Sequence, residues 1–153
     1  MVDSREYFKQ LLLHLQAQIE GELTADKNVC QLLDGEANIV ATLELPEESD
    51  LLLIHRVIAP LSLEPDVRQG RALQLLALNG QPELLRGAWF SIDPDGTAIQ
   101  LMTAYPIQAL QIPEFENLLY NFINLGNTLA VEMAEEEQET GGSDLPLVGG
   151  VRI

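Results

Sequence analysis

The sequence contains few of the residues that most often carry chemistry in proteins. Its 153 residues include one cysteine and two histidines, and aromatic residues make up only 5% of the chain. The single cysteine, Cys30, excludes a disulfide bond within the chain. No apolar run approaches the roughly 18 residues that a membrane-spanning helix needs, and the N-terminus lacks the layout of a signal peptide. We therefore expect a cytoplasmic protein.

Basic residues are also scarce. Eight lysine and arginine residues stand against 24 aspartate and glutamate residues, which gives a formal net charge of −16 at pH 7. Nucleic acids and anionic membranes would repel such a chain, so the charge predicts that neither is a partner. It fits a protein that must remain soluble, or one that meets a basic or aggregation-prone partner.

The motifs of known catalytic and metal sites are missing as well. His55 lies in a predicted strand, where we interpret it as a hydrogen-bonded structural residue. A dyad of Cys30 and His55 across neighbouring strands is an alternative, although no other residue supports it. The run Asp93-Pro94-Asp95-Gly96 imitates the start of a calcium loop, but the later ligand positions lack acids. The residues therefore identify no catalytic or metal site, and we expect neither a metal nor a cofactor.

Turn residues and apolar periodicity predict an α+β domain with one hydrophobic core. Asp93-Pro94-Asp95-Gly96 is typical of a hairpin turn, and Asp34-Gly35 gives a second hairpin signal. The predicted order is α-β-β-β-α-β-β-α, with three helices and a twisted antiparallel sheet of five strands. We expect helices at residues 3–20, 65–79 and from Pro113 onward, and strands at 28–33, 37–45, 51–59, 88–92 and 97–105. The domain covers residues 1–137, and residues 138–153 are expected to form a flexible tail.

The helix expected at 65–79 has an unusual composition. Its second half, from Ala72 to Leu78, is apolar nearly all round, which favours cover on two sides. One side is its own sheet, and we predict that a second subunit covers the other. The predicted homodimer interface contains Leu73, Leu76, Ala77 and Trp89. A helix buried within its own monomer is the alternative.

One stretch carries a family resemblance. A leucine-rich helix ends in Leu78-Asn79-Gly80, a short strand contains Arg86-Gly87-Ala88-Trp89-Phe90, and the turn Asp93-Pro94-Asp95-Gly96 follows. The hairpin at Leu33-Asp34-Gly35 fits the same pattern. Over about residues 4–135 the chain resembles the class I type III secretion chaperones, the Tir-chaperone family.

The resemblance implies a non-enzymatic protein of the bacterial cytoplasm that is associated with virulence. Such chaperones are homodimers that bind the unfolded N-terminal segment of a secreted effector, hold it extended and use no ATP. The apolar end of this chain, from Leu145 to Ile153, departs from the usual acidic ending. We consider it as a placeholder that occupies an effector groove.

The predicted dimer leaves the other end of the sheet for an effector. There the weak strand at 28–33 is expected to form an edge, beside the helix at 3–20, and an edge strand invites an added strand. The predicted effector-binding residues are Leu12, Leu15, Ile19, Val29 and Leu32, although these side chains could simply fill the core. An acidic inhibitor or antitoxin-like protein that caps a basic target is the alternative function, and a small hydrolase would need a polar pocket that the sequence does not provide.

Overall fold

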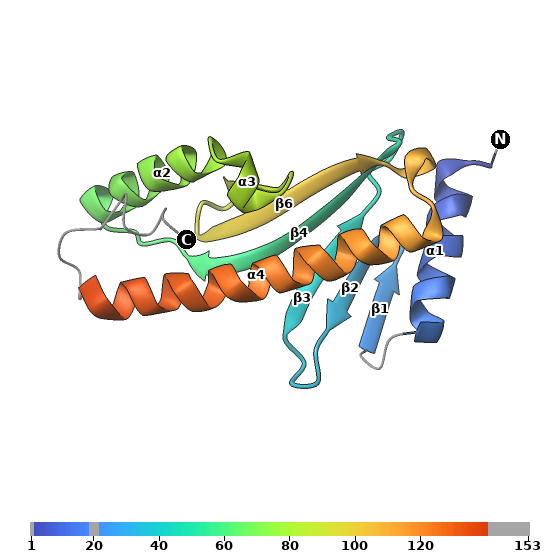
Figure 1. Ribbon diagram of the computed structural model, residues 1–153, viewed down its shortest axis with the longest axis horizontal. Helices are drawn as coiled ribbons and strands as arrows, with labels where there is room; N and C mark the ends of the chain where they lie inside the picture. Colours follow the sequence, from blue (N-terminus) through green and yellow to red (C-terminus); the bar gives the residue numbers. More distant parts are fainter. Residues whose placement is uncertain (1, 19–21, 141–153) are drawn as a thin grey trace. The chain divides into compact units, whose positions relative to one another are not determined.

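The computed structural model describes residues 2–18 and 22–140 of the chain (Figure 1). Residue 19 and the segment 145–153, for which the sequence raised expectations, lie outside the described residues. The described elements, in chain order, are α1 (Ser4–Gln18), β1 (Glu22–Asp26), β2 (Val29–Leu33), β3 (Ile39–Glu44), β4 (Leu51–Pro60), α2 (Pro65–Asn79), α3 (Pro82–Leu85), β5 (Trp89–Ile92), β6 (Ala98–Pro106), η1 (Ile107–Ala109) and α4 (Ile112–Thr140).

The predicted α+β fold is confirmed. All five predicted strands are present within one or two residues of their expected ends, and α2 has the predicted bounds. The described chain adds one strand, β1, and two short helices, α3 and η1. Helix α4 continues to Thr140, so residues 138–140 belong to it.

The strands form one sheet in the order β1-β2-β3-β4-β6-β5. The strand pairs whose register is known are antiparallel, as the hairpin turns require. Cys30 lies opposite Leu43, and Leu43 lies opposite Ile54, so these three residues share one face of the sheet. Helix α4 lies along one face of the sheet (Figure 1).

The prediction that β2 is an edge strand is wrong. Strand β1 pairs with β2 along its whole length, from Glu22 opposite Leu33 to Asp26 opposite Val29, and β1 therefore forms the edge. Only Lys27 and Asn28 separate the two strands, and Lys27 takes a positive φ of 54°. This two-residue hairpin has no glycine, which is why turn chemistry did not reveal it.

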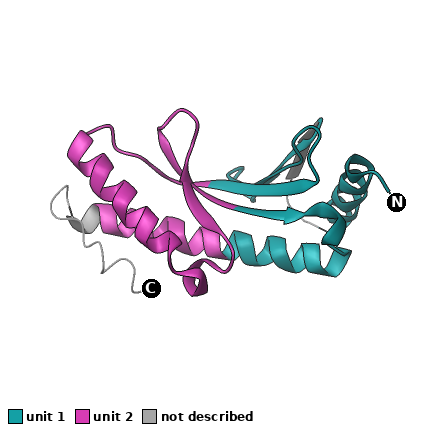
Figure 2. Ribbon diagram, turned by 90° about the horizontal axis from the view of Figure 1, so that it is seen from above, with its two compact units in different colours: residues 1–56, 103–124 teal, residues 57–102, 125–153 magenta. Residues whose placement is uncertain are grey.

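The chain divides into two compact units that are interleaved in sequence (Figure 2). Unit 1 contains residues 1–56 and 103–124, and unit 2 contains residues 57–102 and 125–153. Strands β4 and β6 and helix α4 contribute to both units. The core of unit 1 is built from α1, the first half of α4 and the inner face of β2, β3 and β4, with the fully buried side chains Phe8, Leu11, Leu43, Ile54 and Phe115.

Unit 2 has its own core between α2, α3, β5, β6 and the second half of α4. Its buried apolar side chains include Leu75, Leu78, Leu85, Phe90, Ile99, Leu101 and Leu129. The β5–β6 turn closes one end of this unit. Gly96 has a φ of 71°, and a Cβ atom there would lie only 2.9 Å from Nη2 of Arg68, whose Nη1 donates a hydrogen bond to the Gly96 carbonyl. The positive φ of this turn favours glycine, whereas the end of the flexible Arg68 side chain could shift away from a Cβ atom.

Candidate functional site

The outer side of α2 exposes large apolar side chains. Leu73 is 55% exposed and Leu76 is 67% exposed, while Leu75 and Leu78 on the other side are buried in unit 2. Ala77 is also exposed. Two exposed leucine side chains that are neighbours on one helix are typical of a surface that another molecule covers.

The neighbouring strand extends this surface. Trp89, in β5, is 37% exposed, and Ile92 is exposed to a similar extent. Between α2 and β5 lies an apolar groove of about 230 Å³, lined by Ala72, Leu75, Leu76, Asn79, Phe90, Ser91 and Ile92. The four predicted interface residues are therefore all on accessible parts of unit 2, beside a groove. We call this combination of α2 and β5 the α2–β5 surface.

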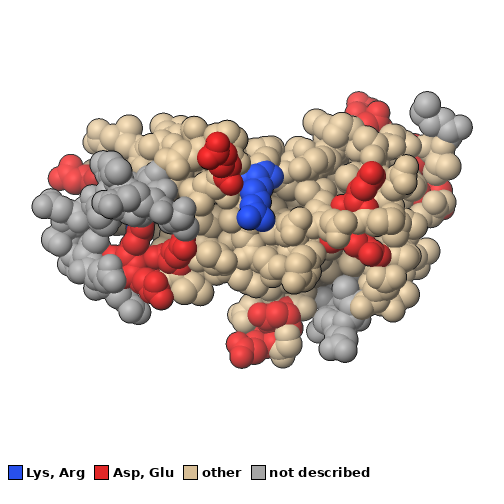
Figure 3. All heavy atoms as spheres, in the orientation of Figure 1, with Lys and Arg blue, Asp and Glu red and all other residues tan. Residues whose placement is uncertain are grey.

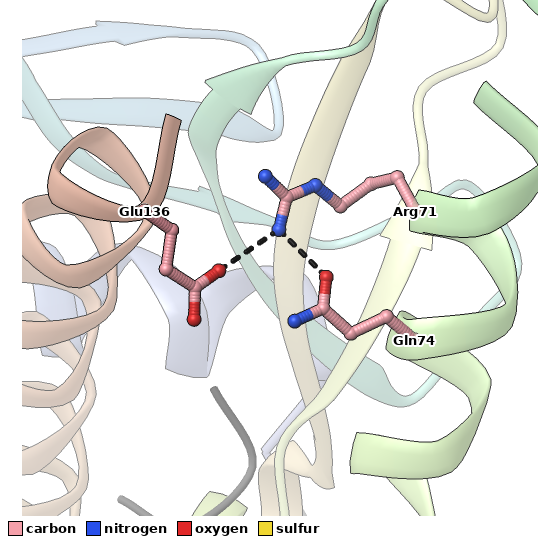
Figure 4. Close-up of polar contacts among 3 residues, drawn as sticks. All are labelled: Arg71, Gln74 and Glu136. Atoms are coloured by element: carbon pink, nitrogen blue, oxygen red, sulfur yellow. Dashed lines mark hydrogen bonds and ion pairs between the residues drawn. The ribbon is translucent and has the colours of Figure 1, made fainter. Parts of the chain in front are cut away.

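A polar cluster holds α2 in this orientation (Figure 4). Nη1 of Arg71 donates to Oε1 of Gln74 at 2.7 Å and lies 3.1 Å from Oε2 of Glu136 on α4. The side chains of Arg71 and Glu136 are only 11% and 16% exposed, and Gln74 is buried. A largely buried, charge-assisted hydrogen bond fixes a helix more firmly than an exposed ion pair does. It therefore fixes which side of α2 faces outward.

One acid beside this cluster is poorly solvated. Oε2 of Glu132 is buried and has no hydrogen-bond partner among the residues that the structure describes. Burial raises the pKa of Glu132 above its usual value, and the charges of Glu136 and Glu135 raise it further. The C-terminal part of α4 thus concentrates negative charge next to α2, with Arg71 as a counter-charge.

Unit 1 presents a different candidate surface. Of the predicted effector-binding residues, Leu12, Leu15 and Leu32 are buried, and Val29 is partly buried. Leu12, Leu15 and Leu32 fill the core in the isolated chain, so they do not line an open pocket. Val29 lies on the other face of β2 from Leu32, so the structure does not bring it together with them. In the described chain, the sheet ends at β1, which pairs with β2 on one side.

Unit 1 also exposes some apolar side chains, of which the sequence did not indicate Ile39 and Leu51. Leu13 in α1 is 67% exposed, and Ile39 and Leu51 are also exposed. Leu13 lies off the apolar stripe of its helix, and the exposure expected from that position is confirmed. Ile39 and Leu51 lie at strand ends, where alternation gives little information about exposure.

The residues considered for chemistry have structural roles. Cys30 is buried, and burial raises the pKa of its thiol to about 11. His55 lies opposite Thr42, on the other face of the sheet from Cys30, and its Nε2 lies 3.4 Å from a carboxylate oxygen of Glu44. The sheet therefore separates the two members of the conceivable dyad.

The Asp93 carboxylate serves the β5–β6 turn. Its Oδ1 accepts hydrogen bonds from the backbone N–H groups of Ala98 and Thr97, and these bonds hold the pKa of Asp93 below its usual value. Over residues 2–18 and 22–140, no group of three or more His, Cys, Asp and Glu side chains is arranged to bind a metal ion. In the same part of the chain, no helix has the length and apolar character of a membrane span.

Acidic side chains lie in several separate groups on the face shown in Figure 3, and basic side chains appear there at one place. Neutral surface separates these groups. On the face shown, the acidic side chains therefore do not form one continuous patch.

The fold has known counterparts among solved structures. One chain of the HopA1–SchA chaperone–effector complex aligns with a TM-score of 0.63 and 20% identity, covering 85% of this chain and 98% of that chain. One chain of the ExsC–ExsE complex aligns with a TM-score of 0.67 and 21% identity, covering 84% of this chain and 95% of that chain. No curated protein sequence matches significantly.

A family model covers most of the chain. The match extends over residues 9–130, which includes most of α1, all of the described strands, α2 and more than half of α4. The matched range contains both the α2–β5 surface and the β1 edge. The chain belongs to the Tir chaperone protein (CesT) family.

Proposed function

We propose that this protein is a class I type III secretion chaperone that acts as a homodimer. It binds the N-terminal segment of a secreted effector in extended form and uses no ATP. Membership of a chaperone family supports this proposal. So does the structural likeness to a chain from a complex of a chaperone with an effector. The observation that carries the dimer is the outward exposure of Leu73 and Leu76 on α2.

The proposed effector contact is the outer edge of β1. The two-residue hairpin makes Asp26 and Val29 the pair that closes the turn, so the backbone groups of Asp26 face β2. Because these groups alternate along a strand, those of Ala25 and Leu23 face outward. An extended segment can pair with them as an added strand. The buried Leu12, Leu15 and Leu32 then support the sheet beneath it.

The charge of the chain suits this task. A domain that leaves apolar side chains exposed risks association with itself, and a net charge of −16 opposes this. An acidic inhibitor would instead present one acidic face to a basic target. On the one face that Figure 3 shows, the acidic side chains lie in separate groups and do not form such a surface.

The first experiment is to use the purified chain to capture partners from the source cell and to identify them by mass. We expect a secreted protein, bound through its N-terminal segment. Capture of a basic toxin or ribonuclease would support the inhibitor instead. Loss of the captured protein on addition of ATP would contradict nucleotide-independent binding.

The second experiment locates the contact with two matched proline variants. Ala25→Pro removes an outward N–H from β1, and Ile92→Pro removes one from the opposite edge strand, β5. We expect Ala25→Pro to weaken binding of the effector's N-terminal peptide by about tenfold or more, measured by calorimetry. Ile92→Pro should leave it unchanged. Equal affinity of both variants and the wild type would place the contact elsewhere.

A further inference from the structure

The outer edge of β5 is unusual for an edge strand. Strand β5 ends the sheet and pairs only with β6. The Asp93 N–H donates to the Ala98 carbonyl across this pair, so the backbone groups of Ser91 and Trp89 also face β6. The groups of Phe90 and Ile92 must then face outward, where they would be open to another strand.

The outward backbone groups of Phe90 are hydrogen-bonded to a side chain of the same chain, that of Asn79. The Phe90 N–H donates to Oδ1 of Asn79 at 2.7 Å, and Nδ2 of Asn79 donates to the Phe90 carbonyl at 3.1 Å. One side-chain amide thus makes both hydrogen bonds that a neighbouring strand would make. Just before it, the Ala88 N–H donates to the Leu85 carbonyl at 3.0 Å.

Asn79 can do this because of its position. It is the last residue of α2, and the N–H of Gly80 bonds back to the Ala77 carbonyl, which fixes the end of the helix. Aspartate would supply the acceptor but not the donor, and leucine would supply neither. An asparagine here satisfies both backbone groups of one residue.

We propose that Asn79 closes the β5 edge to strand addition by a second copy of this chain. The edge needs this protection because Leu76 and Ile92, both exposed, line the apolar groove beside it and favour association. With Asn79 in place, copies meet at the α2–β5 surface through side chains and not through backbone pairing. This inference goes beyond the proposed function, since effector binding at β1 requires nothing of the β5 edge.

The test compares Asn79→Ala with Asn121→Ala, a matched control at an exposed asparagine of α4. Both variants are first checked for folding by circular dichroism. We expect self-association of Asn79→Ala, measured by sedimentation across micromolar concentrations, to be about tenfold tighter than that of wild type, the equivalent of one or two backbone hydrogen bonds. Asn121→Ala should match wild type. A folded Asn79→Ala that associates no more tightly than wild type would overturn the proposal.

A second variant tests whether the new association uses this edge. Adding Ile92→Pro to Asn79→Ala removes the outward N–H of Ile92, and proline is tolerated at such an edge position. We expect the double variant to return to the association of Ile92→Pro alone. Association that persists undiminished would mean that another surface is responsible, contrary to the proposal.

Hydrogen exchange on the wild-type protein tests the geometry without any substitution. The Phe90 amide hydrogen should exchange slowly because the N–H donates a hydrogen bond to Oδ1 of Asn79. If it exchanges as fast as an unprotected amide, Asn79 does not close the edge, whatever the variants do. This measurement decides the matter if Asn79→Ala fails to fold.

Discussion

Helices α1 and α2 are both fifteen residues long and both rich in leucine, but they place their leucines differently. In α1, Leu11, Leu12 and Leu15 lie in the core of unit 1. In α2, Leu73 and Leu76 are exposed on the side away from the core of unit 2. A helix with a single apolar stripe buries that stripe against one sheet. A helix that is apolar nearly all round keeps exposed apolar surface that a partner can cover.

The largest expected effect comes from placing a charge on the exposed side of α2. In Leu76→Asp, each dimer interface would contain two carboxylates without partners, at a cost on the order of several kcal/mol. We expect the dimer to dissociate into folded monomers, as measured by light scattering together with circular dichroism.

Leu13→Asp is the control for that variant. Leu13 in α1 and Leu76 in α2 are both 67% exposed, so the same charge is added at equal exposure. The Leu13→Asp protein should remain a dimer. A wild-type protein that is a stable monomer at micromolar concentration would refute the dimer, and equal dissociation of both variants would remove the distinction between the helices.

A second pair of variants sharpens the contrast within α1. Leu11 is 1% exposed, and Leu11→Ala should lower the free energy of unfolding by about 2–5 kcal/mol because it leaves a cavity in the core. Leu13→Ala should change it by less than about 0.5 kcal/mol. Urea unfolding at one fixed protein concentration measures both. Similar losses in the two variants would show that Leu13 is covered in solution.

The smallest expected effect concerns the end of α4 beside α2. Because the pKa of Glu132 is raised above 4.5 in the folded chain, the native state binds this proton more tightly than the unfolded state does. Stability from this group is therefore present below pH 4.5 and is lost as pH rises through the folded pKa. Glu132→Gln should raise the free energy of unfolding at pH 7 by up to about 1 kcal/mol.

The pH profile distinguishes this cause from a general charge effect. The stability curves of wild type and Glu132→Gln should converge below pH 4.5 and separate above it. Glu137→Gln, at an exposed position of the same helix, should follow wild type more closely. Parallel curves for wild type and Glu132→Gln over the whole range would contradict the assignment.

Local signals in the sequence were sufficient for most of the fold. Asp34-Gly35 and Asp93 to Gly96 located both hairpins because their turn geometry demands particular residues. Pro65 and the Asn79-Gly80 step located the ends of α2 for the same reason. Strand β1 was not predicted because its turn, Lys27-Asn28, lacks the glycine of the usual two-residue hairpin signals.

The sites were harder to predict than the fold. Periodicity shows which side chains of α1 are apolar, but it does not tell whether a core or a ligand covers them. Leu12 and Leu15 were therefore proposed as pocket residues, and the structure buries them. For α2 the number of apolar residues exceeded what one sheet can cover, so exposure could be inferred. The role of Asn79 depends on the register of β5, which no local pattern encodes.

Because Cys30 is buried, chemical labelling of its thiol can report local opening of the sheet around β2. With a thiol pKa of about 11, only about one molecule in ten thousand carries a thiolate at pH 7, and the folded sheet shields the sulfur from reagents. Alkylation under native conditions therefore proceeds through openings that expose β2. Since the sequence has one cysteine, each labelled molecule reports one such opening. Labelling kinetics would show whether a bound effector segment holds this part of the sheet closed.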